Sequence, residues 1–270
     1  MIIKGGLTML LSNAPRCRYD RPQLLEVICQ LRFPTILAIG ANEPAAFQDT
    51  IRDTFPKYTA LTERPAPKIV GAGTAAPQLE QAKPITNYNF VSLDGRWKLN
   101  LTQSFIALST TAYTGWEEFA ARLDKPLAQF IALYQPAAFE RIGLRYVNAF
   151  SRTALGLDGT PWRRLIAPEY CGVLGFEDVD EARVGKCASD IELDAGGCHL
   201  KLHAGPGVIR RGGKPNGKPR FIFDADVSMS GELPVNLAVG GLNTLHNCAW
   251  SALRGAISDE LHEAMGPHEL

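Results

Sequence analysis

The chain has 270 residues, enough for one large domain or two smaller ones with a hydrophobic core. Its 28 basic and 28 acidic side chains cancel, so the overall charge does not favour nucleic acid or an anionic membrane as a partner. The sequence has no run near the roughly 20 apolar residues of a membrane span, and its 6 cysteines form no C-x-x-C motif. We therefore expect a cytoplasmic protein with reduced cysteines and no cofactor.

Alternating apolar side chains predict four strands in the first half of the chain, at 24–33, 88–93, 97–109 and 139–150. Asp94-Gly95, between the second and third strands, is a typical hairpin turn. Residues 62–87 are rich in proline, alanine and glycine, and we expect them to form a long surface loop.

Two helices are predicted between these strands. Asn42 is a candidate N-cap for the first, and Pro44 suits its first turn. Thr114 and Glu117 form a capping-box pattern for the second, and Pro126 inside it is expected to kink or split the helix. The order β-α-β-β-α-β then predicts a ferredoxin-like sheet, in which the last strand lies antiparallel beside the first.

The second half of the chain predicts three more strands, at 188–194, 198–203 and 221–229. Gly196-Gly197 should form the turn between the first two, and a last helix should begin at Asn243 or Thr244 and end at Gly266-Pro267.

This pattern divides the chain into four parts: a flexible N-terminal arm at 1–18, a ferredoxin-like half at 19–150, an irregular connection at 151–187, and a sheet with a C-terminal helix at 188–270. The predicted fold class is α+β, with the ferredoxin-like first half packed against a second antiparallel sheet-plus-helix half.

Several stretches of sequence resemble a known family. They are 21–34 (RPQLLEVICQLRFP) with Phe47-Gln48 after it, 141–148 (RIGLRYVN) and 221–227 (FIFDADV). After its N-terminal arm, the chain is similar to a sporadically distributed family of uncharacterised prokaryotic proteins of similar length. The scattered distribution of that family implies a setting in bacterial host–mobile-element conflict, and the resemblance implies no catalytic residue.

The first candidate site is the polar face of the predicted sheet. The side chains on this face are Glu26, Gln30, Lys98, Asn100, Arg141 and Arg145, together with Gly143. Two arginines beside a glycine can hold a carboxylate or phosphate in bidentate fashion. Alternatively, Glu26 pairs with one of the arginines and the second half of the chain covers this face.

The second candidate site is the glycine-rich loop that precedes the strand at 221–229. Its cations are Arg210, Arg211, Lys214, Lys218 and Arg220, and it contains no acid. Such a loop suits a phosphate group or an acidic partner, but it lacks the G-K-[S/T] ending of a P-loop. The alternative interpretation is a solvated hairpin tip.

The third candidate site is Asp224 with Asp226, whose side chains lie about 7 Å apart along one face of a strand and can share a divalent cation. The neighbouring strands carry alternating charged residues on the same face: Asp190, Glu192 and Asp194, then His199, Lys201 and His203. Cross-strand pairs of opposite charge explain these residues equally well.

Together these patterns favour a non-enzymatic binding or accessory protein in a cytosolic complex, with a protein partner and no membrane contact. The alternative is an enzyme that processes a nucleotide or nucleic acid. In that case Asp224 with Asp226, or Arg141 with Arg145, would contact phosphate, and the 210–220 loop would contact nucleic acid.

Overall fold

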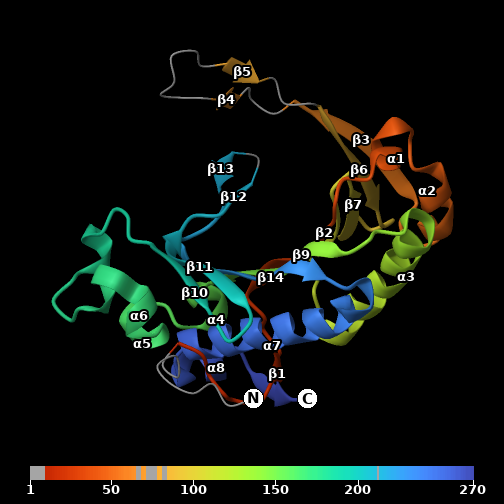
Figure 1. The fold of residues 1–270 in the computed structure, drawn as a ribbon. Helices are drawn as coiled ribbons and strands as arrows, with labels where there is room; N and C mark the ends of the chain where they lie inside the picture. The colour runs from red at the N-terminus through yellow and green to blue at the C-terminus, as the bar shows by residue number, and fades with distance from the viewer. Residues whose placement is uncertain (1–9, 65–67, 71–77, 81–83, 212) are drawn as a thin grey trace.

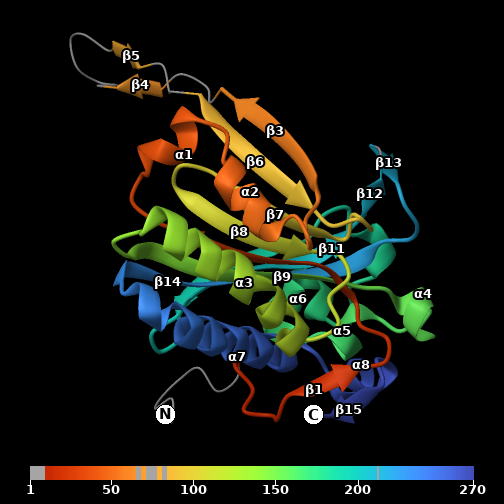
Figure 2. The same ribbon diagram turned by 90° about the vertical axis from the view of Figure 1, so that its right-hand side faces the viewer.

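The computed structural model describes residues 10–64, 68–70, 78–80, 84–211 and 213–270. Its central feature is an antiparallel sheet of nine strands with long helices packed against one face (Figures 1 and 2). The protein is therefore α+β, as the sequence predicts.

The strands of this sheet are β2 (Leu24–Arg32), β3 (Lys57–Glu63), β6 (Ile85–Val91), β7 (Trp97–Leu101), β8 (Phe105–Thr110), β9 (Phe139–Phe150), β10 (Ser189–Asp194), β11 (His199–Gly207) and β14 (Arg220–Leu233). Three short pairs lie outside it: β1 (Cys17–Tyr19) with β15 (Pro267–Glu269), β4 (Lys68–Val70) with β5 (Gln78–Glu80), and β12 (Arg210–Arg211) with β13 (Lys214–Pro215). The helices are α1 (Leu37–Ala41), α2 (Ala45–Ile51), α3 (Trp116–Tyr134), α4 (Arg152–Leu155), α5 (Trp162–Leu165), α6 (Pro168–Cys171), α7 (Ala238–Ala256) and α8 (Asp259–Ala264).

The strands of the second half continue the sheet of the first. The order across the sheet is β10-β11-β14-β9-β2-β8-β7-β6-β3. As expected, β9 lies antiparallel beside β2. The sequence predicts a second sheet packed against the first, whereas the structure places β14 on the free edge of β9, from Phe221 opposite Phe150 to Ser230 opposite Arg141. The correction has a simple cause: β9 has two edges, and pairing satisfies the backbone groups of both.

One face of the sheet is apolar because apolar side chains alternate along each central strand. Val27, Cys29 and Leu31 of β2 are fully buried, and the apolar residues of β9 and β14 extend the same face. Helices α2, α3 and α7 pack on this face (Figure 2). The segment containing α4, α5 and α6 packs there too, since Trp162 contacts Phe221 and Tyr170 contacts Phe223.

Two predicted elements of the first half change their extent. The strand predicted at 97–109 is two strands, β7 and β8, because the Thr102 hydroxyl accepts hydrogen bonds from the backbone N–H groups of Ser104 and Phe105 and turns the chain. The loop predicted at 62–87 begins inside β3 and ends inside β6, which pair with each other. Part of that loop, 65–67, 71–77 and 81–83, lies outside the described residues.

The predicted caps of the first two helices are also corrected. Asn42 ends α1 instead of starting α2, which begins after Pro44. Helix α3 begins after Gly115, and the Thr114 hydroxyl bonds to the side chain of Glu118 rather than to a backbone N–H group. Helix α3 then runs through Pro126 as one element, so the predicted split does not occur.

The predicted last helix is two helices. Helix α7 begins at Ala238, ahead of the predicted cap, and ends at Ala256. There the chain becomes extended, and Ile257 forms a bridge with Ile166. The Ser258 side chain then accepts from the Leu261 N–H and starts α8. Contact with a distant segment therefore interrupts a helix that the local pattern favours.

The described part of the predicted N-terminal arm, residues 10–18, packs against α7. Leu11 is buried, and the Trp250 indole N–H donates to the Ala14 carbonyl at 3.1 Å. Strand β1 pairs with β15 near the C-terminus. Among the described residues, no helix is both long and apolar enough to cross a membrane.

Because β14 pairs directly with β9, we expect both halves of the chain to unfold in one transition. Hydrogen exchange in increasing urea should give peptides of β7–β8 and of β11 the same unfolding midpoint. Far-UV circular dichroism supplies the global midpoint for comparison. Loss of protection in β11 at clearly lower urea, with β7–β8 still protected, would show that the second half is an independent unit.

Candidate functional site

The polar face of the sheet brings two of the predicted sites together. Arg145 holds Asp224 through two hydrogen bonds, Nε to Oδ1 at 2.8 Å and Nη2 to Oδ2 at 2.5 Å. Arg141 Nη2 donates to Asp226 Oδ1 at 2.8 Å. The two arginines predicted to bind an anion and the two aspartates predicted to bind a metal are therefore partners of each other.

Gly143 is explained by the direction of these ion pairs. Asp226 lies opposite Arg145 in the strand register, so Arg141 must reach diagonally past Gly143 to meet it. A Cβ atom at Gly143 would lie 2.5 Å from Arg141 Nη1. The glycine therefore leaves the space in which the Arg141 guanidinium lies.

The other predicted polar-face residues have different surroundings. Glu26 forms no ion pair with any described residue, so the predicted pairing of Glu26 with an arginine is not found. Gln30 accepts from Arg32 Nε at 3.1 Å, and Lys98 is exposed. Asn100 is buried in an amide cluster, where its side chain donates to those of Asn87 and Asn89.

Cross-strand pairs also engage the charged residues of the outer strands. Lys201 contacts Glu192 at 2.5 Å and His203 contacts Asp190 at 2.8 Å. Within the described ranges, no group of three or more His, Cys, Asp or Glu residues is placed to hold a metal ion. A cation at Asp224 and Asp226 would have to displace two guanidinium groups, and the metal site stays a prediction.

The predicted basic loop contains the β12–β13 hairpin, which stands on the side of the sheet away from α7 (Figure 1). Lys218 pairs with Asp158 at 3.2 Å, and Arg220 is half-buried at the start of β14. Arg210 and Lys214 are exposed and form no ion pair with a described residue. The placement of the Arg211 side chain is outside the described part of the chain.

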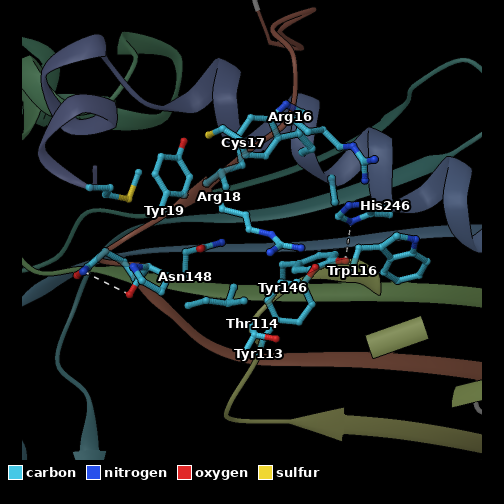
Figure 3. Close-up of a pocket in the computed structure, with 18 of the residues that line it drawn as sticks. Arg16, Cys17, Arg18, Tyr19, Tyr113, Thr114, Trp116, Tyr146, Asn148 and His246 are labelled. Carbon is cyan, nitrogen blue, oxygen red and sulfur yellow. Dashed lines mark hydrogen bonds between the residues drawn. The ribbon is translucent and has the colours of Figure 1, made fainter. Parts of the chain in front are cut away.

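A cavity of about 380 Å³ lies on the opposite, apolar side of the sheet. Its floor is formed by β9 and β14, and its walls by the start of α3, by α7 and by β1 (Figure 3). Seven phenylalanine, tyrosine and tryptophan side chains line it: Tyr19, Tyr113, Trp116, Tyr146, Phe150, Phe223 and Trp250. The cavity is thus assembled from segments near residues 18, 115, 147, 224 and 248, which no local pattern connects.

His246 is the titratable group on the α7 wall of the cavity. Its Nδ1 lies 2.9 Å from the Tyr146 hydroxyl, and its ring stacks on Trp116 at 4.7 Å between centroids. Burial, helped by the positive charge of Arg16, lowers the pKa of His246 to about 4. Burial also raises the pKa of Tyr146. Both side chains are therefore neutral at neutral pH.

The cavity also contains polar groups with few protein partners. Asn148 is 5% exposed, and its amide nitrogen makes one long contact, 3.5 Å, with the Phe223 carbonyl. Arg16 is half-buried and forms no ion pair with a described residue. Arg18 contacts the Glu117 carboxylate at 3.3 Å. Figure 3 shows both arginines extending from the β1 side toward Tyr146 and His246.

The sequence analysis did not predict this cavity. One local signal was present: Asn148 continues the face of Ile142, Leu144 and Tyr146, so an amide lies on the apolar side of β9. A polar residue at a core position needs a partner, and that partner can be a ligand. Arg16 and Arg18 gave no such signal, because they lie in the segment predicted to be a flexible arm.

The depressed pKa of His246 predicts a pH effect on stability. The unfolded chain binds a proton as the pH falls through 6.5, the ordinary histidine value, whereas the folded protein does so only near pH 4. This group should therefore cost about 2 kcal/mol of unfolding free energy between about pH 7.5 and about pH 5. Urea titrations at both pH values should show a smaller loss for His246→Gln than for the wild type. Equal pH dependence in the two proteins would contradict the assignment.

The fit of Arg141 over Gly143 predicts coupling between two substitutions. Gly143→Ala should displace the guanidinium from Asp226, at a cost of about 0.5 to 1 kcal/mol for a partly exposed pair. The same substitution in an Asp226→Asn background should be neutral or stabilising, because the ion pair is already absent and alanine suits a strand better than glycine. A double-mutant cycle of unfolding free energies measures this coupling, and additive effects would argue against it.

Comparisons with known proteins do not place the chain in a family. No protein-family model matches the chain, and no curated protein sequence matches it significantly. We therefore infer the function from the geometry of the cavity and of the polar face.

Proposed function

We propose that this protein is a non-enzymatic binding protein that holds a small organic ligand in its cavity and acts as an accessory protein within a cytosolic complex. The observation that carries this proposal is the cavity itself, about 380 Å³ in volume. Binding sites for small molecules commonly measure about 300 to 1,000 Å³ and combine apolar walls with a few polar groups. Aromatic walls with His246, Asn148, Arg16 and Arg18 between them fit that description.

The titratable groups of the cavity support binding over catalysis. A general base works best when its pKa is near the working pH, whereas that of His246 is about 4. Burial raises the pKa of the Cys17 thiol, which disfavours the nucleophilic thiolate. Asp20, whose carboxylate is another titratable group at the cavity, is held by an ion-pair contact of 2.8 Å between its Oδ1 and His268 Nε2. These groups suit the recognition of a ligand better than proton transfer or nucleophilic attack.

A second candidate is a nucleotide- or nucleic-acid-processing enzyme that uses an arginine or metal phosphate site. The exposed cations Arg210 and Lys214 favour contact with phosphate. The two ion pairs weigh against it, because phosphate or metal would have to separate Arg141 from Asp226 and Arg145 from Asp224. Binding of single-stranded DNA that weakens steeply with salt would favour this candidate.

At the level of fold, we propose that the first half is an elaborated ferredoxin-like unit. Strands β9, β2, β8 and β7 are neighbours in that order. When β3 and β6 are counted as additions, this is the 4-1-3-2 strand order of a ferredoxin-like sheet. We also propose membership of the sporadically distributed prokaryotic family, and a role in bacterial host–mobile-element conflict, on the motifs at 21–34 and 141–148.

The small-ligand function can be tested with a neutral aromatic dye. N-phenyl-1-naphthylamine should fluoresce more strongly when it enters the cavity. Ala249, buried on α7 at the cavity wall, should weaken binding of the dye at least about tenfold when changed to phenylalanine, because the larger side chain occupies the space. Ala132→Phe, at an exposed position of α3, is the matched control. Circular dichroism confirms that each variant is folded, and absence of dye binding to the wild type would refute the proposal.

A further inference from the structure

We infer that the ligand of this cavity is a small planar-ring molecule with one anionic group, a carboxylate or a phosphate, held by Arg16 and Arg18. This inference rests on the proposed function and names the chemical class of the ligand.

Arg16 is the main reason to expect an anionic group. Its positive charge acts on Tyr113, Tyr146 and His246. Burial keeps the two tyrosines protonated by raising their pKa values, and His246 is neutral, so these three side chains supply no negative charge. The Glu117 carboxylate lines the same cavity, but its ion pair is with Arg18 and not with Arg16. A half-buried guanidinium without a carboxylate partner among the described residues is a favourable position for an anion.

Arg18 adds a second cation whose present partner is easily replaced. Its contact with Glu117 is 3.3 Å long, and both side chains are 58% exposed. Exposed ion pairs contribute little stability, so exchanging the Glu117 carboxylate for that of a ligand costs little. Both arginines come from the β1 segment, which β15 holds in place beside the cavity.

The walls of the cavity specify the planar ring. Tyr113 meets Tyr146 edge-on at 5.8 Å between centroids, and Trp116 stacks on His246 at 4.7 Å with an angle of 10°. Aromatic rings contact other rings favourably in both arrangements. A flat ligand therefore finds ring faces and ring edges already oriented by contacts within the protein.

Asn148 specifies a polar atom near the ring. Its amide is nine-tenths or more buried at the cavity floor and makes one long hydrogen bond with the described residues, so it retains donor and acceptor capacity. Leaving such a group unpaired is costly, and a ligand atom that bonds to it removes this cost. Thus the anion lies at the β1 side, the ring at the α3–α7 side, and the hydrogen-bonding atom near β9.

Three probes that share a naphthalene ring system separate the contribution of the anionic group from that of the ring: 1-naphthoate, 1-naphthyl phosphate and the neutral 1-naphthamide. In calorimetric titrations of the full chain, at least one anion should bind about tenfold or more tightly than the amide. Arg16→Gln should remove this preference and leave the affinity for the amide unchanged. Arg96→Gln, an exposed arginine at a hairpin turn, is the matched control and should change nothing. The tighter of the two anions identifies carboxylate or phosphate as the preferred group.

The inference is overturned if both anions bind no better than the amide, or if Arg16→Gln weakens all three probes equally. If neither anion binds but the neutral dye does, the ligand class is wrong and the binding function stands. If the dye also fails to bind, the binding function fails as well. Should Arg16→Gln not fold, Arg18→Gln provides the same comparison, with a smaller expected loss of anion affinity.

Discussion

The pairing of β14 with β9 is the contact on which the rest of this structure depends. It joins the strands after residue 188 to those before residue 150 in a single sheet. The apolar side of the paired strands supplies the cavity floor through Tyr146, Asn148 and Phe223. The polar side carries both arginine–aspartate pairs. One set of backbone hydrogen bonds therefore sets the geometry of both surfaces.

The two faces of the sheet differ in how their charges are used. On the polar face, the arginines of β9 are neutralised by the aspartates of β14, and the outer strands form further pairs. Groups already paired within the protein must be separated before they can bind anything else. In the cavity, Arg16 and Asn148 lack comparable partners among the described residues. The proposed ligand site is therefore on the side of the sheet that has fewer charged residues.

Two contacts between distant helices complete the cavity. The Trp116 indole N–H at the start of α3 donates to Asn243 of α7 at 2.7 Å, and the same indole stacks on His246. His246 is in turn bonded to Tyr146 of β9. This chain of contacts holds two helices and the sheet in one arrangement, which favours a preformed site over one that assembles around its ligand.

Local sequence patterns were enough to predict the α+β class, the positions of β2 and β9, and the turns at Gly95 and at Gly196 with Gly197. Those features depend on side-chain alternation and on backbone angles, which neighbouring residues set. The adjacency of β2 and β9 follows instead from the topology expected for the order of the elements. The break at Ile257, the joining of β14 to β9 and the neutralisation of Arg141 and Arg145 depended on segments far apart in the chain. The cavity belongs to this second group. It arises from tertiary packing alone, because its walls come from separate segments that meet only after the sheet and helices have packed.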